Sequence, residues 1–237
     1  MEYGLIGGRL GHSYSKVIHE MLCGYRYDLC PLPTEEEVRA FMTRRQFRAI
    51  NVTIPYKLVV MEYCSYIDPH AKAINAVNTI VDARRVYIQG AMSSGILASF
   101  MHYYLRLIFD KVTLIGSVAT SEIYQQMIHI GEGDVFIGLS FPRYAKSTIN
   151  ACKFAHDCGS QIIAITDSEN SPLAQYAHTT LCAYSDMVSF VDSLVAPMSL
   201  LNALIVAVSN RNRCRVEQTF RKLETLWDNN DVYKKDV

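Results

Sequence analysis

The stretch "AVNTIVDARRVYIQGAMSSG", residues 76–95, joins two different sequence patterns and decides how the chain is divided. Its second part predicts a strand from Val86 to Gln89, a tight glycine turn, and a helix start that carries the hydroxyls of Ser93 and Ser94. Backbone N–H groups at a helix start, together with neighbouring hydroxyls, suit a phosphate group. A capped helix behind a glycine turn would give the same pattern, so this motif alone leaves both interpretations open.

The chain on either side of this stretch alternates short strand-like runs with helical ones, a pattern typical of parallel sheets covered by helices. The one polar break between two strand-like runs is Asp82–Arg85. We therefore expect an α/β fold of two three-layer domains, residues 1–83 and 84–237. The expected strands are residues 3–6, 25–30, 49–53, 77–81, 86–89, 112–115, 134–138, 162–166 and 179–182. The expected helices are 15–22, 56–63, 69–73, 121–129, 146–158, 172–177, 192–210 and 213–227, with further ones that start at Thr34 and Ser94.

Composition sets limits on the class of protein. Half of the 237 residues are hydrophobic and 19% are charged, so more apolar surface is expected than a small monomer carries, and an oligomer is expected. Lys plus Arg equals Asp plus Glu, 23 each, so no long-range field favours nucleic acid or an anionic membrane. Any anion must therefore be bound locally.

The seven cysteines are scattered, odd in number and never spaced as C-x-x-C. With no secretory segment at the start of the sequence, this pattern indicates reduced thiols in the cytoplasm, without disulfides or a metal site. The longest apolar run, Leu194–Val208, is shorter than a membrane span and is expected to form a buried helix that packs against a second subunit.

Three stretches of the first half suggest a site for a small polar ligand: "GLIGGRLGHSYSKVIHE" (4–20), "INVTIPYK" (50–57) and "AKAINAVNTIV" (71–81). Ser13 and Ser15 lie at a predicted helix start, where a carboxylate would be favoured, although simple helix capping is the alternative. In isolation Lys57 would be interpreted as a solvated surface lysine.

Together these stretches resemble the substrate-binding domain of shikimate dehydrogenase over residues 1–81. The resemblance implies that Ser13 and Ser15 hold a carboxylate and that Thr53 and Asn78 contact ring hydroxyls, with Asn51 beside Thr53 as a further candidate. It also implies that Lys57 corresponds to the catalytic lysine, which assists proton movement at the alcohol carbon.

The sequence departs from this family in ways that bear on activity. Arg9 and Lys16 replace prolines, Glu20 replaces an asparagine, and Ala49 replaces a glycine. After "AVNT" the chain lacks the G-x-N-T-D stretch with the aspartate that partners the lysine. No G-x-G-x-x-G follows a strand, so neither NADP nor any other cofactor is expected, and dehydrogenase activity is not expected.

The second half resembles the SIS (sugar isomerase) domain found in the sensor halves of RpiR-type transcription regulators. The resemblance rests on "GDVFIGLSFPRYAKSTINACKFAHDCGSQIIAITDSENSPLAQYAHTTL" (133–181) and "DSLVAPMSLLNALIVAV" (192–208). It implies a flavodoxin-like five-stranded parallel sheet, a homodimer through this domain, and binding of a carbohydrate derivative, a sugar phosphate, beside the strand ends. Ser93, Ser94 and Ser140 match hydroxyls around the phosphate.

In the loop after the expected strand 134–138, Pro142 and Ala145 stand where this family usually has two more hydroxyls. Arg143 or Lys146 would compensate with positive charge, and Arg143 joins the candidate phosphate-binding set. An isomerase also needs a glutamate and often a histidine; Glu122, His129 and His156 are candidates, each with the alternative of an ordinary helix-face residue.

We therefore expect a cytoplasmic homodimer that binds a sugar phosphate or a shikimate-like polyhydroxy carboxylate, in a sensing or regulatory role. The alternatives are a sugar-phosphate isomerase or a residual shikimate dehydrogenase-like enzyme, and a purely structural role in dimerisation. No contact with nucleic acid or membrane is expected, because the charges balance. DNA binding is further disfavoured because the shikimate-like half stands where the regulators carry a helix-turn-helix.

Overall fold

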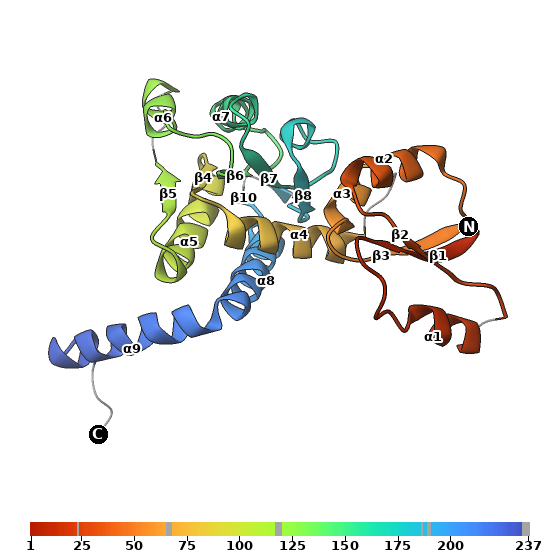
Figure 1. Ribbon diagram of the computed structural model, residues 1–237. Helices are drawn as coiled ribbons and strands as arrows, with labels where there is room; N and C mark the ends of the chain where they lie inside the picture. Colours follow the sequence, from red (N-terminus) through yellow and green to blue (C-terminus); the bar gives the residue numbers. More distant parts are fainter. Residues whose placement is uncertain (23, 65–67, 117–119, 186, 189–190, 234–237) are drawn as a thin grey trace. The chain divides into compact units, whose positions relative to one another are not determined.

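The computed structural model describes residues 1–22, 24–64, 68–116, 120–185, 187–188 and 191–233 (Figure 1). By their contacts these residues form two compact units, Met1–Asp68 and Pro69–Val237. The division thus comes before residues 69–82, which the contacts assign to the second unit. Each unit is described by itself.

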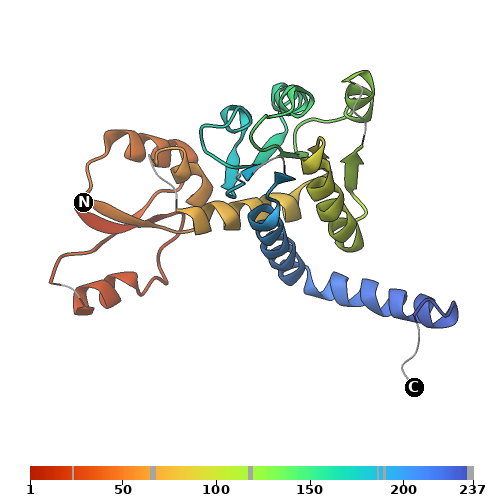
Figure 2. The same ribbon diagram turned by 180° about the vertical axis from the view of Figure 1, so that it is seen from behind.

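The first unit is built on a three-stranded parallel sheet of order β2-β1-β3. Its centre is β1, in which Leu5 and Ile6 are both buried but belong to the cores on opposite faces. Helix α1 lies on one face, and α2 and α3 lie on the other (Figures 1 and 2). The elements are β1 (Tyr3–Gly7), α1 (Ser15–Leu22), β2 (Asp28–Pro31), α2 (Glu35–Arg44), β3 (Ala49–Val52) and α3 (Lys57–Met61). The capping box predicted at Thr34 and Glu37 is present at the start of α2.

The second unit contains a five-stranded parallel sheet of order β5-β4-β6-β7-β8. Its strands are continuous apolar runs because both faces of the sheet are covered. Ile137 of β6 illustrates this, since it is paired with Ile88 and Ile163 and is fully buried. The strands are β4 (Val86–Gly90), β5 (Val112–Ile115), β6 (Val135–Leu139), β7 (Gln161–Thr166) and β8 (Thr179–Cys182), with a small antiparallel pair, β9 (Met187–Val188) and β10 (Val191–Asp192).

Helices cover both faces of this sheet, as Figures 1 and 2 show from opposite sides. Helices α4, α5 and α8 pack on one face, and α6 and α7 pack on the other, which gives three layers. The helices are α4 (Pro69–Asp82), α5 (Ser93–Ile108), α6 (Thr120–Gln126), α7 (Lys146–Asp157), the 3-10 helix η1 (Ala174–Tyr176), α8 (Val195–Arg211) and α9 (Arg213–Asn229). The expected α/β class with a flavodoxin-like second sheet is confirmed.

Three differences from the local predictions have a clear physical reason or change the element type. Residues 77–81 are not a strand but the end of α4, because Ala76, Val77 and Ile80 lie on one helix face and become buried there. The helix expected at 172–177 is only a short 3-10 turn. The helix expected from residue 192 begins at Val195, because Val191 and Asp192 pair with β9.

No helix among the described residues is long and apolar enough to span a membrane.

The six cysteines in the described part of the chain are free thiols, and Cys23 lies outside it. The most deeply placed is Cys152, where burial raises the pKa of the thiol to about 12. A thiol with so high a pKa is a poor nucleophile.

Candidate functional site

The order of the strands in the second unit selects one edge of the sheet for ligand binding. The chain passes from β4 to β5 on one side and then crosses back to β6 on the other side of β4. In an open parallel sheet, a crevice opens at the carboxyl ends of two neighbouring strands when the connections that follow them leave in opposite directions. Here the two neighbouring strands are β4 and β6. The crevice of this sheet lies where Gly90 of β4 is paired with Leu139 of β6.

A tight corner follows β4. A side chain at Gly90 would place its Cβ 2.4 Å from the carbonyl oxygen of Ser94, so only glycine allows the first turn of α5 to approach the strand so closely. Helix α5 then begins at Ser93, and Ser94 is buried. The N–H groups of Ser94 and Gly95 already donate hydrogen bonds to the carbonyls of Ala91 and Met92, at 3.1 and 2.9 Å, so this corner offers chiefly its serine hydroxyls to an anion.

The loop that follows β6 forms the wall of the crevice opposite the corner after β4. Ser140 is only 2% exposed, and its Oγ accepts a hydrogen bond of 3.3 Å from the backbone N–H of Ala145. Arg143 lies between them with a φ of 76°, and Met92 across the crevice has a φ of 55°. Residues other than glycine rarely adopt such positive φ angles, and residues held in them tend to gather at functional sites.

These two loops enclose a cavity of about 360 Å³. Its size lies within the range of small-molecule sites. The structure brings four sequence-predicted residues together in its wall: Ser93, Ser94, Ser140 and Arg143. The remaining lining residues are Ala91, Met92, Phe141, Pro142, Ala145 and Asp192.

Asp192 is the lining residue that the sequence did not predict. Its carboxylate accepts a hydrogen bond of 2.7 Å from the Ser93 hydroxyl and one of 2.9 Å from the Arg143 guanidinium. These interactions, that of Ser93 first, lower the pKa of Asp192 below its usual value of 3.8. At neutral pH the cavity therefore holds a carboxylate on two of the donors that a phosphate would use.

Two buried polar atoms in the elements that frame the crevice have no hydrogen-bond partner among the described residues. They are Oε1 of Gln89, which precedes Gly90 in β4, and Oγ1 of Thr148, in the first turn of α7. Buried oxygen atoms are normally paired, because an unpaired one costs free energy. Neither residue lines the cavity between the two loops, and both atoms are out of reach of solvent.

The isomerase candidates lie elsewhere. Glu122 is on α6, His129 is in the turn after it, and His156 is on α7, and none of the three is among the residues that line this cavity. Lys146 opens α7 and does not line it either. Among the described residues, no group of three or more His, Cys, Asp or Glu side chains is placed to hold a metal ion.

The shikimate-like candidates of the first unit lie at two strand ends. Ser13 accepts a hydrogen bond of 3.3 Å from the Ser15 N–H, a local turn just before α1. After β3, Thr53 donates its N–H to the Ile6 carbonyl at 3.0 Å, and Lys57 is exposed at the start of α3.

The amide of Asn51 takes part in a cluster that the sequence did not reveal. It donates a hydrogen bond of 2.6 Å to the Tyr27 hydroxyl and lies 3.2 Å from Nε2 of His19. The His19 ring stacks on Tyr27 with 4.1 Å between the ring centroids. The sixth candidate, Asn78, lies on α4 in the second unit, where its Oδ1 accepts a hydrogen bond of 2.8 Å from Arg211.

Comparison with protein families divides the chain in the same way as its two sequence patterns. Residues 79–207 match the model of the SIS domain, and residues 5–80 match that of the shikimate dehydrogenase substrate binding domain. Both resemblances inferred from the sequence are confirmed.

Curated relatives are shikimate dehydrogenases (NADP(+)). The protein from Shouchella clausii is 38% identical over 90 residues, which cover 34% of this chain and 32% of the relative. The one from Bacillus cereus is 29% identical over 168 residues, which cover 64% of this chain and 58% of the relative. The chain thus spans less than three fifths of the length of these relatives.

Two solved structures each resemble about two thirds of this chain. The sugar isomerase domain of an RpiR transcription factor from Sphaerobacter thermophilus is 25% identical with a TM-score of 0.62, over 65% of this chain and 86% of that one. The Vibrio vulnificus NanR protein, solved in complex with ManNAc-6P, is 16% identical with a TM-score of 0.59, over 67% of this chain and 61% of that one. The NanR likeness shows a shared fold.

Proposed function

The chain belongs to the SIS domain family, and from this we propose that its second unit binds a phosphorylated sugar in the cavity between the ends of β4 and β6. The observation that supports this most strongly is that three serines and one arginine line one cavity at the switch point of the sheet. That NanR, with the same fold, was solved with ManNAc-6P supports the choice of a sugar phosphate.

The phosphate is placed by its donors. The Ser93 and Ser94 hydroxyls supply hydrogen bonds from one side, and Ser140 and Arg143 supply them from the other. Since Asp192 already accepts hydrogen bonds from Ser93 and Arg143, a phosphate must displace its carboxylate to reach these two donors. This competition is expected to keep the affinity moderate.

Binding is favoured over isomerisation by the acid–base groups of the cavity. Interconversion of an aldose and a ketose needs a general base, which works best with a pKa near the operating pH. The one carboxylate in the described wall is Asp192, and its hydrogen bonds from Ser93 and Arg143 lower its pKa, which makes it a weak base. We therefore propose a sensing or regulatory role, and an assay for conversion of fructose 6-phosphate tests the isomerase alternative.

Replacement of Ser94 by alanine is expected to weaken sugar-phosphate binding about tenfold, the usual effect of losing one hydrogen bond to a charged group. Ser94 is buried in the cavity wall. Isothermal titration calorimetry measures the change. Ser199→Ala is the matched control, because that hydroxyl is on the exposed part of α8 and bonds the Val195 carbonyl. Equal affinities for wild type and Ser94→Ala would show that the phosphate lies elsewhere.

We further propose that the second unit forms a homodimer through α5 and α8. Both helices expose large apolar side chains, among them Ile96 and Tyr103 on α5 and Val206 on α8, which are 61%, 53% and 57% exposed. When exposed apolar side chains form a contiguous patch, they often mark a subunit interface.

Val206→Glu is therefore expected to convert the dimer into a monomer, because a buried carboxylate without a partner opposes association. Sedimentation equilibrium measures the mass. Val232→Glu is the matched control, since Val232 is similarly exposed but lies after α9. A wild-type chain that stays monomeric across the micromolar range would contradict the proposed dimer.

The first unit supports a second candidate function, the binding of a polyhydroxy carboxylate. The match of residues 5–80 to the shikimate dehydrogenase substrate binding domain favours it, and so do Ser13 and Ser15 at the start of α1 and Lys57 at the start of α3. The proposed role is binding without dehydrogenase activity. Calorimetry with shikimate and quinate tests it, and neither should release heat of binding if this site has been lost.

A further inference from the structure

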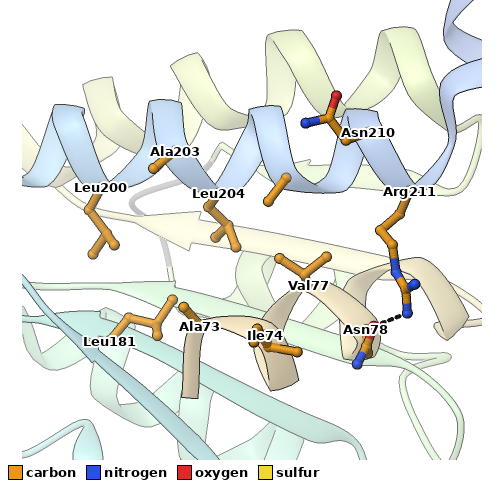
Figure 3. A pocket seen from close by; sticks show the side chains of 11 residues that line it. Ala73, Ile74, Val77, Asn78, Leu181, Leu200, Ala203, Leu204, Asn210 and Arg211 are labelled. Carbon is orange, nitrogen blue, oxygen red and sulfur yellow. Dashed lines mark hydrogen bonds between the residues drawn. The ribbon is translucent and has the colours of Figure 1, made fainter. Parts of the chain in front are cut away.

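A second cavity lies between α4 and α8, distinct from the proposed sugar-phosphate site. Its volume is about 640 Å³, and it is lined by residues of α4, α8 and β8 (Figure 3). Val77, Leu181 and Leu204 are buried and form its floor, and Ile74 is 62% exposed on its rim. Three of the other lining residues, Ala73, Ala203 and Ala207, are small, which leaves the space open. A cavity of this size and composition suits an apolar small molecule.

One end of the cavity carries a positive charge in a fixed position. Arg211 extends from the end of α8 toward α4, where one of its N–H groups donates a hydrogen bond of 2.8 Å to Oδ1 of Asn78 (Figure 3). A guanidinium has five N–H donors, so others remain for a ligand. None of the ion pairs formed by the described residues includes Arg211. Asn210 points away from α4, so the polar end consists of Arg211 and Asn78.

We propose that this cavity binds an apolar carboxylate. The carboxylate pairs with the Arg211 guanidinium, and the hydrocarbon part lies against Val77, Leu200 and Leu204. Arginine is suited to this role because its planar fork matches the two carboxylate oxygens. Asn78 acts as a positioning residue, because its amide oxygen holds the guanidinium at the mouth of the cavity.

The charge favours a small acid over a segment of another protein. An interface between copies of this chain would need to place a carboxylate of the partner opposite Arg211 and an apolar ridge in the cavity at the same time. A fatty or aryl acid carries both features in one molecule. The proposal does not depend on sugar-phosphate binding, because the two cavities share no lining residue.

A chain-length series tests the proposal. Calorimetric titrations of the full chain with hexanoate, octanoate and decanoate, below their micellar concentrations, are expected to show saturable binding whose affinity rises about fourfold for each added methylene. Decanol, which has the same chain but no charge, is expected to bind at least about tenfold more weakly than decanoate.

Two variants locate the site. Arg211→Met keeps an apolar chain but removes the charge, and it should weaken decanoate binding about tenfold or more. Ala203→Phe, at an exposed helix position in the cavity wall, should abolish decanoate binding by filling the space. Arg221→Met removes an arginine from α9, outside the cavity, and should have no effect. Sugar-phosphate binding should be unchanged in all three variants.

Several results would overturn the proposal. Absence of saturable binding by any of the acids would do so, as would equal affinities for decanol and decanoate. Unchanged decanoate binding in Arg211→Met would place the ligand elsewhere. If Ala203→Phe dissociates a dimer in sedimentation experiments while the wild-type chain binds no acid, the cavity is a contact between subunits.

Discussion

Replacement of Gly90 by alanine is expected to abolish sugar-phosphate binding and to lower the free energy of unfolding by about 1–3 kcal/mol, the usual cost of overpacking. The new Cβ would lie 2.4 Å from the Ser94 carbonyl oxygen and 2.8 Å from its carbon, both backbone atoms. The first turn of α5 must therefore move, and the Ser93 and Ser94 hydroxyls move with it. Binding groups displaced by more than about half an ångström lose their ligand.

Calorimetry with a sugar phosphate and urea unfolding measure the two effects of Gly90→Ala. Gly116→Ala is the matched control, because a Cβ there meets nothing within 4 Å. The control should bind and unfold like the wild type. If Gly90→Ala retains wild-type affinity, the corner after β4 does not hold the phosphate.

The second large effect is a gain in affinity for the sugar phosphate. Asp192→Asn is expected to tighten sugar-phosphate binding about 10- to 100-fold, because a negative charge beside the phosphate position is removed. The amide oxygen of asparagine can still accept a hydrogen bond from Ser93 or Arg143, so the geometry of the corner is preserved. Since the pKa of Asp192 is lowered below 3.8, the carboxylate stays charged near neutral pH, and only the substitution removes its charge.

Competition titrations of wild type and Asp192→Asn at one ionic strength measure this gain. Asp110→Asn is the control, because Asp110 pairs with Arg215 and does not line the cavity. Weaker binding by Asp192→Asn would mean that this carboxylate contacts the ligand, for example at a sugar hydroxyl. It would then be a binding group and not a competitor of the phosphate.

The second sheet could be predicted well from the sequence, for a physical reason. Strands buried on both faces appear as short apolar runs between turn residues, and β5 and β8 were predicted with their correct bounds. The end of α4 could not be identified in this way. Val77, Thr79 and Ile80 are β-branched and favour a strand locally, but burial of one helix face in the core of the second unit outweighs that preference.

The candidate phosphate site could be predicted in the part that follows from local sequence. Ser93, Ser94, Ser140 and Arg143 each lie just after a strand, and parallel strands bring such positions to one edge. Asp192 could not be found in this way. It meets Ser93 across 99 positions of sequence, through the short β10 strand, and no local pattern marks that contact.

Asn78 makes a contact that the sequence did not predict. The "AVNT" motif implied a contact with ring hydroxyls in the first domain, yet Asn78 lies on α4 and bonds Arg211 of α8. The sequence does not predict this contact, because α4 and α8 are distant in the sequence and lie side by side only in the folded chain (Figure 3).

The central claim is that the corner between β4 and β6 holds the phosphate of a sugar phosphate. The most direct test is a calorimetric titration of the chain with glucose 6-phosphate, fructose 6-phosphate and N-acetylmannosamine 6-phosphate, each beside its unphosphorylated sugar. We predict saturable binding of at least one phosphosugar and no detectable binding of its parent sugar. Binding of neither kind, or of both with equal affinity, would contradict the claim.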